Sequence, residues 1–205
     1  MADRRIRKTR TSLIEAFLGL VVERGYEHVT VQDILDRADV GRSTFYAHYR
    51  DKEALLMSCF DELRDGLTAE FDVRTPSIAL FDHAYRHRPV YRALCGRAGG
   101  TVVQRHLHAL IGTALRTHLE PRLAAAGSSL GAKTMAEAMA EFYTSALLGL
   151  LIWWVGQDFK GGPHAIARLY AALAEPGIAA AYGGAKPVAG RTADPERRKV
   201  VSSTT

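Results

Sequence analysis

The sequence has few signals for β-strands, disulfide bonds or membrane insertion. Apolar and polar residues do not alternate with a period of two, and the 2 cysteines among the 205 residues lack a CxxC spacing. The most apolar run, Ala146 to Val155, has ten residues, whereas a helix needs roughly 20 to span a bilayer. The charged N-terminus, without a following apolar segment, also differs from a signal peptide. These absences predict an all-α, cytoplasmic protein with reduced thiols and no membrane contact.

Motifs of several enzyme classes are also missing. The sequence has no P-loop, no HExxH zinc motif and no GxGxxG following a strand. The glycine-rich stretch Gly96 to Gly100 follows a predicted helix, so it lacks the context of a phosphate-binding loop. His83 and His87 have the HxxxH spacing of a metal pair, but the only nearby third ligand is Asp82, which is expected to point elsewhere. We therefore expect no catalytic residue, metal or cofactor, and we interpret the two histidines as part of an exposed basic face.

Two short helical patterns flank a tight turn in the first third of the chain. The first pattern follows Thr30, a capping residue with Asp33 three positions later, and places its apolar residues on one helical face. The second pattern, Arg42 to His48, is polar over most of its surface, and only Phe45 and Tyr49 share a plausible inward face. A helix that directs its hydrogen-bond donors outward is suited to a polar partner.

The segment VTVQDILDRADVGRSTFYAHYRDKEALL, preceded by a helical pattern ending in ERGYE, resembles the N-terminal DNA-binding domain of TetR-family bacterial transcriptional regulators. The resemblance combines a fixed spacing over three helices with aromatic residues at Phe45, Tyr46 and Tyr49 and a lysine at Lys52. It implies an all-α fold of about nine helices. A three-helix helix-turn-helix domain would come first, and a helical domain for ligand binding and dimerisation would follow.

The second helix of a helix-turn-helix lies in the major groove of DNA, and neighbouring residues hold the phosphate backbone. Arg42 opens this helix and can donate two hydrogen bonds to one guanine. The hydroxyls of Thr44 and Tyr46 and the charge of Lys52 suit phosphate oxygens, whereas Tyr49 fits a phosphate contact or a buried strut equally well. With the residues that the resemblance implies, the predicted DNA contacts are Gln32, Arg42, Ser43, Thr44, Tyr46, His48, Tyr49 and Lys52.

Positive charge is concentrated at the two ends of the chain. The formal net charge is +5, with +4 from residues 1–10, +3 from residues 186–205 and −2 from the stretch between them. We interpret residues 1–8 as a basic arm for phosphates or a minor groove, with a solubilising tail as the alternative. Residues 184–205 contain few large apolar side chains, so we expect a disordered basic tail.

Turn signals and apolar stripes predict two domains. The DNA-binding domain is expected over residues 9–68, with its helix-turn-helix motif at about 30–49, and the effector-binding and dimerisation domain over residues 69–183. The apolar stripe of the helix that begins near Asp51 continues to Leu67, so one continuous helix is expected to link the domains mechanically. Further helices are expected over 77–88, 89–97, 101–119 and 133–156, with a last one from 163.

The predicted helix from Lys133 to Gly156 is apolar around more than one face, so both sides must be covered. We expect a second copy of the chain to cover one side in an intersubunit four-helix bundle, as the resemblance also implies. A homodimer has the two-fold symmetry needed to read a palindromic double-stranded operator, with half-sites about 34–36 Å apart. The predicted interface residues are Leu147, Leu150, Leu151, Trp154, Ile166, Leu169 and Tyr170.

A small-molecule effector is expected in the second domain, in a mostly apolar pocket with a few polar groups. The candidate lining residues, each of which also fits a core position, are Phe81, Tyr85, Tyr91, Cys95, His106, Leu110, Phe142 and Tyr143. The resemblance favours a repressor that the effector releases from its operator. The alternative is a TetR-like regulator whose second domain binds a partner protein in place of a metabolite.

Overall fold

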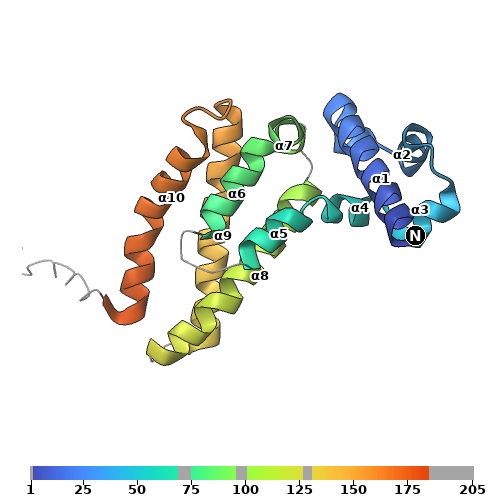
Figure 1. The fold of residues 1–205 in the computed structure, drawn as a ribbon. Helices are drawn as coiled ribbons and strands as arrows, with labels where there is room; N and C mark the ends of the chain where they lie inside the picture. The colour runs from blue at the N-terminus through green and yellow to red at the C-terminus, as the bar shows by residue number, and fades with distance from the viewer. Residues whose placement is uncertain (1, 69–74, 96–100, 127–130, 185–205) are drawn as a thin grey trace, which may run out of the picture.

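The computed structural model describes residues 2–68, 75–95, 101–126 and 131–184, and in these ranges the chain contains helices and no strands. The structure therefore confirms the all-α prediction, with ten α-helices arranged in two lobes (Figure 1). The α-helices are α1 (Ala2–Arg24), α2 (Val31–Ala38), α3 (Arg42–His48), α4 (Lys52–Ser58), α5 (Asp61–Thr68), α6 (Thr75–Arg86), α7 (Arg88–Cys95), α8 (Thr101–Ala126), α9 (Ala132–Gly156) and α10 (Gly162–Ala179). Short irregular helices cover Tyr26–His28 and Ala180–Gly184. The predicted tail falls almost wholly outside the described residues.

The N-terminal lobe is built around the apolar stripe of α1. Leu13, Phe17 and Val21 are fully buried against the helices that follow. The helix ends before Gly25, whose φ of 80° lies in a region that side chains disfavour. At its other end, α1 already begins at Ala2, so the segment expected as a separate basic arm belongs to the helix. Arginine and lysine are good helix formers, and their charge does not prevent them from extending α1.

The continuous helix expected to link the two lobes is divided into α4 and α5. At the break, the amide of Cys59 donates to the carbonyl of Leu56, and the amide of Phe60 donates to the carbonyl of Met57. Both bonds span three residues, so the last turn of α4 is tighter than an α-helical turn. The hydroxyl of Ser58 also donates to the carbonyl of Leu55. The link between the lobes is therefore a bent helix pair, because local hydrogen bonds end α4 where the apolar stripe alone predicts continuation.

Helices α6 to α10 form the C-terminal lobe, close to the predicted positions. The main difference is α8, which was expected to end near Leu119 but continues through Pro121 to Ala126. Leu119 and Leu123 lie one turn apart and are both buried. Their burial holds the helix together across the proline, which removes only one backbone donor.

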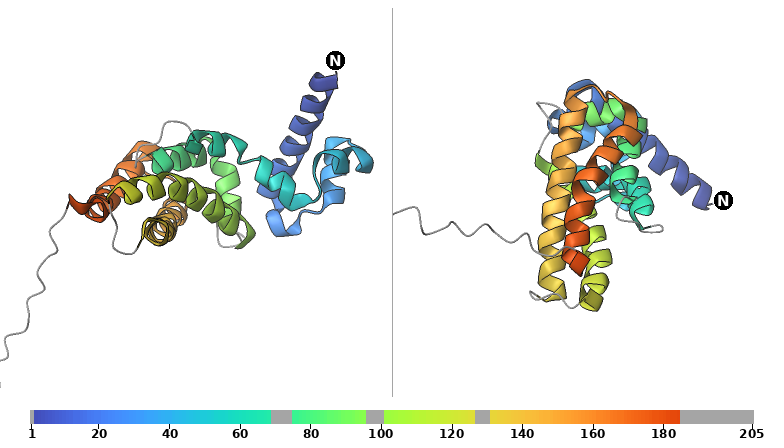
Figure 2. Two further views of the ribbon diagram at one scale, coloured as in Figure 1. Left: turned by 90° about the horizontal axis from the view of Figure 1, so that it is seen from below. Right: turned by 90° about the vertical axis from the view of Figure 1, so that its left-hand side faces the viewer.

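Helices α8 and α9 pack side by side along much of their length, and this pair forms the centre of the lobe. Among the described residues, α9 is the one helix long and apolar enough to cross a membrane by length and composition. Half of that apolar window is nevertheless buried inside the structure, as in the core helix of a helical domain. Figure 2 shows α9 and α10 beside each other at the end of the molecule away from α1–α3.

Candidate DNA-binding interface

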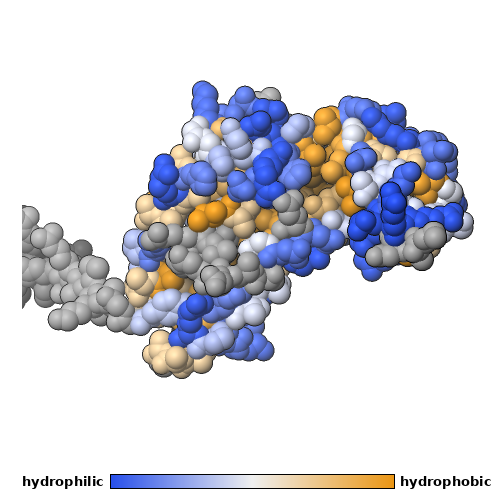
Figure 3. All heavy atoms as spheres, viewed as in Figure 1, coloured by the Kyte–Doolittle hydropathy of each residue, from blue (hydrophilic) through white to orange (hydrophobic). Residues whose placement is uncertain are grey.

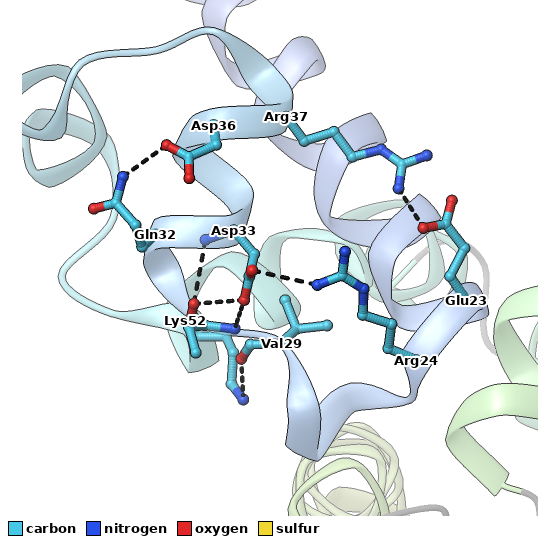
Figure 4. A network of polar contacts seen from close by, with 9 residues as sticks. Glu23, Arg24, Val29, Gln32, Asp33, Asp36, Arg37 and Lys52 are labelled. Atoms are coloured by element: carbon cyan, nitrogen blue, oxygen red, sulfur yellow. Dashed lines mark hydrogen bonds and ion pairs between the residues drawn. The ribbon is translucent and has the colours of Figure 1, made fainter.

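A capping box fixes the start of α2 and the entry into the helix-turn-helix. The amide of Asp33 donates to the Thr30 hydroxyl at 3.2 Å, and the Thr30 amide donates to the Asp33 carboxylate at 2.9 Å. The Thr30 hydroxyl also donates to this carboxylate, and the hydrogen bonds from the Thr30 hydroxyl and amide, with the charge of Arg24, lower the pKa of Asp33. Arg24 reaches the same carboxylate from the end of α1, as Figure 4 shows. The two helices are thus joined at their ends by a charged network.

The recognition helix α3 presents a polar surface to solvent. Phe45 is fully buried and anchors the helix to the core of the lobe. The side chains of Arg42, Ser43 and Thr44 are exposed, and Tyr46 is exposed despite its ring. Its ring packs edge-on against Phe45, with 5.3 Å between the centroids, which fixes the direction of the hydroxyl. Four of the predicted contacts, Arg42, Ser43, Thr44 and Tyr46, are therefore accessible to a partner, and His48 is partly buried.

Arg42 belongs to a chain of side-chain hydrogen bonds that crosses from α3 to α2. Its guanidinium donates to the carbonyl oxygen of Gln32 at 2.9 Å, and the Gln32 amide nitrogen donates to the carboxylate of Asp36 at 2.7 Å. Figure 4 shows the contact between Gln32 and Asp36 on the outer side of α2. Two predicted DNA contacts are therefore held together, with an acidic residue, Asp36, that was not among the predicted contacts.

Tyr49 is a buried strut in this structure, one of the two roles that its position in the sequence allows. Only 5% of the residue is exposed. Its hydroxyl accepts a hydrogen bond from Nε of Arg10 at 3.3 Å and lies 3.4 Å from the hydroxyl of Ser58. The side chain ties α3 to α1 and α4, which leaves its hydroxyl turned away from the outer face of α3.

Lys52 has a different set of partners from the one expected. Its ammonium donates to the carbonyls of Tyr26 and Val29 at 2.9 and 2.8 Å, and it lies 4.1 Å from the centre of the Tyr26 ring. Burial lowers the pKa of this partly buried lysine. The sequence predicted a phosphate contact for Lys52, and in this structure the amine closes the turn between α1 and α2. Two backbone carbonyls converge there only after the chain has folded.

The acidic neighbours of Lys52 have other partners. Asp51 pairs with Arg50 and caps α4 through the amide of Ala54. Glu53 accepts hydrogen bonds from His106 and Arg105 of α8, and these bonds lower its pKa. Glu53 thereby joins the DNA-binding lobe to the C-terminal lobe. His106 was expected in an effector pocket and instead belongs to this contact.

The residues predicted to form one effector pocket do not come together. Phe81 and Cys95 are buried in the core, and Phe142 is 66% exposed on α9. Of the cavities found among the described residues, one is lined by Tyr91, and another by Phe142 and Tyr143. The predicted pocket residues are therefore divided between core and surface positions on several helices. Their helical spacing does not show which helix faces pack against one another.

The expected exposed basic face around His83 and His87 is also incorrect. His83 is 3% exposed, and its Nδ1 lies 2.9 Å from the hydroxyl of Tyr91 on α7. The two imidazole rings lie 4.6 Å apart. The nearby arginines do face solvent, where Arg86 pairs with Asp82 and Arg92 pairs with Asp158. Helix α6 thus carries an ion pair at its surface and a buried imidazole at His83.

Most of the residues predicted to form the dimer interface lie in the core of a single chain. Five of the seven, namely Leu147, Leu151, Trp154, Ile166 and Tyr170, are buried. Leu150 is partly buried and Leu169 is 44% exposed. The large exposed apolar residues of α9 and α10 are Phe142, Trp153, Leu169 and Leu173. Both sides of α9 are apolar, so its sequence could not show which side α8 covers.

Comparison with known proteins identifies the family. The model of bacterial regulatory proteins of the TetR family matches residues 13–59, and a model of a transcriptional regulator C-terminal region matches residues 76–176. The chain belongs to the TetR family. TetR regulators bind DNA and control transcription, and they are not enzymes, so these two sequence predictions are confirmed.

Similar regulators include the HTH-type transcriptional regulator TcmR of Streptomyces glaucescens, which is 32% identical over 74 residues. This match covers 36% of the present chain and 33% of TcmR. The A-factor receptor protein of Streptomyces griseus is 31% identical over 93 residues, or 42% of this chain and 33% of that protein. The chain thus matches about a third of the length of these TetR-type relatives.

Solved structures show the same fold over both lobes. A TetR regulator from Streptococcus agalactiae has a TM-score of 0.58 and 24% identity, covering 84% of this chain and 97% of that one. NalD of Pseudomonas aeruginosa, the secondary repressor of the MexAB-OprM multidrug efflux pump, has a TM-score of 0.53 and 18% identity, covering 84% and 97%. The TetR fold therefore extends beyond the DNA-binding domain into the helices that follow.

Proposed function

We propose that this TetR-family protein is a cytoplasmic, homodimeric repressor that binds a palindromic operator and leaves it when a small molecule binds the C-terminal lobe. The observation that supports DNA reading best is the outward face of α3. There Arg42 is exposed at the first turn and its guanidinium is held by Gln32 of α2. A planar donor fixed at the head of a recognition helix suits the two acceptors of guanine in the major groove.

The second lobe supports the proposed dimer through the apolar surface of α9 and α10. Phe142, Trp153 and Leu173 are 66%, 54% and 72% exposed. Together with smaller side chains they line a shallow groove of about 330 Å³. Large apolar side chains gathered on one face mark interaction sites in soluble proteins. A two-fold related copy would cover this face and place two α3 helices for a symmetric operator.

Repression and release require that the C-terminal lobe changes the position of α3. Three contacts provide a route: the bent pair α4 and α5, the packing of α7 on α1, and the bridge from Glu53 to α8. An effector that favours another arrangement of these contacts would lower operator affinity. By linkage, operator DNA would lower the affinity for the effector by the same factor.

Selection from random double-stranded DNA tests this function directly. We expect an inverted repeat with half-site centres about 10–10.5 base pairs apart. Arg42→Ala should relax the base preference at one symmetric pair of positions, at a cost of about 1–3 kcal/mol in discrimination. Arg116→Ala removes an exposed arginine of α8 and serves as the matched control.

The outcomes separate the components of the proposal. An equal loss of affinity across all sequences for Arg42→Ala would make Arg42 a phosphate contact. Selection of a site without symmetry would contradict the palindromic operator. If no metabolite releases the operator but a protein from cell extract does, the C-terminal lobe binds a partner protein.

A further inference from the structure

A cavity of about 200 Å³ lies at the junction of the two lobes. Helices α1 and α4 and the turn that follows α4 form its DNA-binding side, and α6 and α7 form its C-terminal side. Ile14 and Leu18 contribute from α1, and Val90 and Leu94 from α7. Figure 3 shows hydrophobic residues gathered where the two lobes meet. The wall of this cavity is therefore shared by the two lobes that an effector must couple.

The size and the walls of the cavity suit a single aromatic ring. An apolar protein cavity of about 150 Å³ holds one benzene molecule, so 200 Å³ leaves room for a ring with a small substituent. Phe60 and Tyr91 present their rings to this space and pack edge-on, with 6.4 Å between their centroids. An aromatic ligand can continue this cluster with the edge and face contacts that aromatic rings prefer.

Hydrogen-bonding groups lie on one part of the wall. His83 and Tyr91 both line the cavity, and their side chains are joined by a hydrogen bond of 2.9 Å. His87 also lines the cavity, with its imidazole ring 4.6 Å from that of His83. A hydroxyl can both donate to an imidazole nitrogen and accept from a tyrosine, so it matches this mixed set of groups.

The electrostatic character of the cavity favours a neutral ligand. No lysine, arginine, aspartate or glutamate is among the residues that line it in the described part of the chain. Burial raises the pKa of the Cys59 thiol to about 12 and that of the Tyr91 hydroxyl well above its ordinary value. The site thus disfavours negative charge, and a buried carboxylate without a cation would be costly.

We propose that this cavity at the junction of the lobes is the effector site and that its ligand is a neutral monocyclic phenol. The inference rests on the proposed function and assigns a site to the effector. The aromatic ring would lie among Leu18, Leu94 and Phe60, with its hydroxyl toward His83 and Tyr91. A ligand wedged between α1 and α7 changes how these packed helices fit together, and α1 packs against α2 and is hydrogen-bonded through Arg10 to Tyr49 at the end of α3.

Calorimetric titration with phenol, toluene and benzoate tests the ligand class. These three probes share one ring and differ in their polar group and charge. We expect phenol to bind more tightly than toluene and benzoate, and saturating phenol to lower operator affinity about 5- to 150-fold. Benzoate binding more tightly than phenol would overturn the neutral class, and no binding of phenol would overturn the site.

A pair of matched variants tests the location. Val90→Phe extends a cavity-lining side chain into the space and should lower phenol affinity by at least about tenfold. Val22→Phe makes the same change at a 45% exposed position of α1 outside the cavity, and it should bind phenol as the unaltered protein does. Equal phenol affinity in the two variants would show that phenol does not bind in this cavity.

Tyr91→Phe tests the hydrogen-bonding wall while it preserves the ring. It should weaken phenol binding about 2- to 12-fold, the range of one neutral hydrogen bond, and leave toluene binding unchanged. Equal losses for both probes would overturn the assigned hydroxyl contact. Operator binding without ligand is measured for the unaltered protein and for every variant. Failure of the unaltered protein to bind any operator would contradict the proposed function and would not bear on the ligand site. Phenol binding without operator release would overturn the effector role of the cavity.

Discussion

Two short helices of the N-terminal lobe, α2 and α4, are capped by side chains at their ends, whereas the long helices α8 and α9 of the C-terminal lobe pack along their sides. Helix α2 has a reciprocal capping box, α4 is capped by Asp51, and the Ser12 hydroxyl donates to the last carbonyl of α2. Helix α9 begins after Gly131 without a side-chain cap and instead buries a long stripe against α8. Short helices have few internal hydrogen bonds, so their caps are a larger share of their stability.

The difference shows what each lobe leaves available for partners. In the N-terminal lobe, aromatic anchors point inward and polar groups outward, as with Phe45 and Arg42 on α3. In the C-terminal lobe, α9 has Leu147 buried on one side and Phe142 exposed on the other. The first arrangement suits a charged nucleic acid, and the second suits an apolar surface such as a second copy of the chain.

The largest expected effect comes from placing a charge on the exposed apolar face. Leu173 is 72% exposed in the single chain, so Leu173→Asp should leave the fold intact and give soluble monomers. Operator affinity should then fall about 10²- to 10⁴-fold, because two half-sites are no longer bound together. Light scattering and operator titration measure the two effects. Ile78→Asp, at a 44% exposed position of α6, is the control. A Leu173→Asp protein that remains a dimer would show that the interface does not include Leu173.

Two phenylalanines provide a sharper comparison of the lobes. Phe45 is fully buried and Phe142 is 66% exposed. Phe45→Ala should lower the free energy of unfolding by about 3–5 kcal/mol, whereas Phe142→Ala should change it by less than about 0.5 kcal/mol. Urea unfolding in a monomeric Leu173→Asp background excludes the contribution of dimer dissociation. Similar losses for the two variants would contradict the assignment of Phe142 to a surface.

A smaller effect is expected at Lys52, which stabilises the N-terminal lobe through the carbonyls of Tyr26 and Val29. Lys52→Met keeps an apolar stem of similar length and should lower the free energy of unfolding by about 1–3 kcal/mol. Urea unfolding measures this loss. The salt dependence of operator binding should stay unchanged, and a slope reduced by about one would instead identify a phosphate contact.

The smallest expected effect concerns the bridge between the lobes. Hydrogen bonds from His106 and Arg105 lower the pKa of Glu53 below its ordinary value of 4.5, so folding favours the charged carboxylate. Its contribution to stability is complete above about pH 4.5 and is lost as the pH falls through the lowered pKa.

Glu53→Gln should therefore show a weaker dependence of the unfolding midpoint on pH below that value, by a small amount because the Glu53 side chain is 37% exposed to solvent. Thermal unfolding across this pH range measures the difference. Glu137→Gln, an exposed position of α9, is the control, and identical pH profiles for both variants would show that the bridge does not stabilise the fold.

Local patterns predicted most of the helices and the outer face of α3. The capping box at Thr30 and the burial of Phe45 follow from short-range spacing, and the structure has both. The patterns failed where a side chain meets a distant segment. Lys52 contacts carbonyls more than twenty residues earlier in the chain, and His106 contacts Glu53 from another lobe.

The amino-acid sequence by itself determined the helical class, the helix-turn-helix and the family, because helix periodicity and caps depend on residues within a few positions of one another. Only the tertiary structure decided which apolar faces become core and which stay exposed. Trp153 and Trp154 are adjacent and equally apolar, yet the first is 54% exposed and the second 1%. Which of the two tryptophans is buried depends on where α8 and α6 pack against α9, and neighbouring residues in the sequence do not encode this packing.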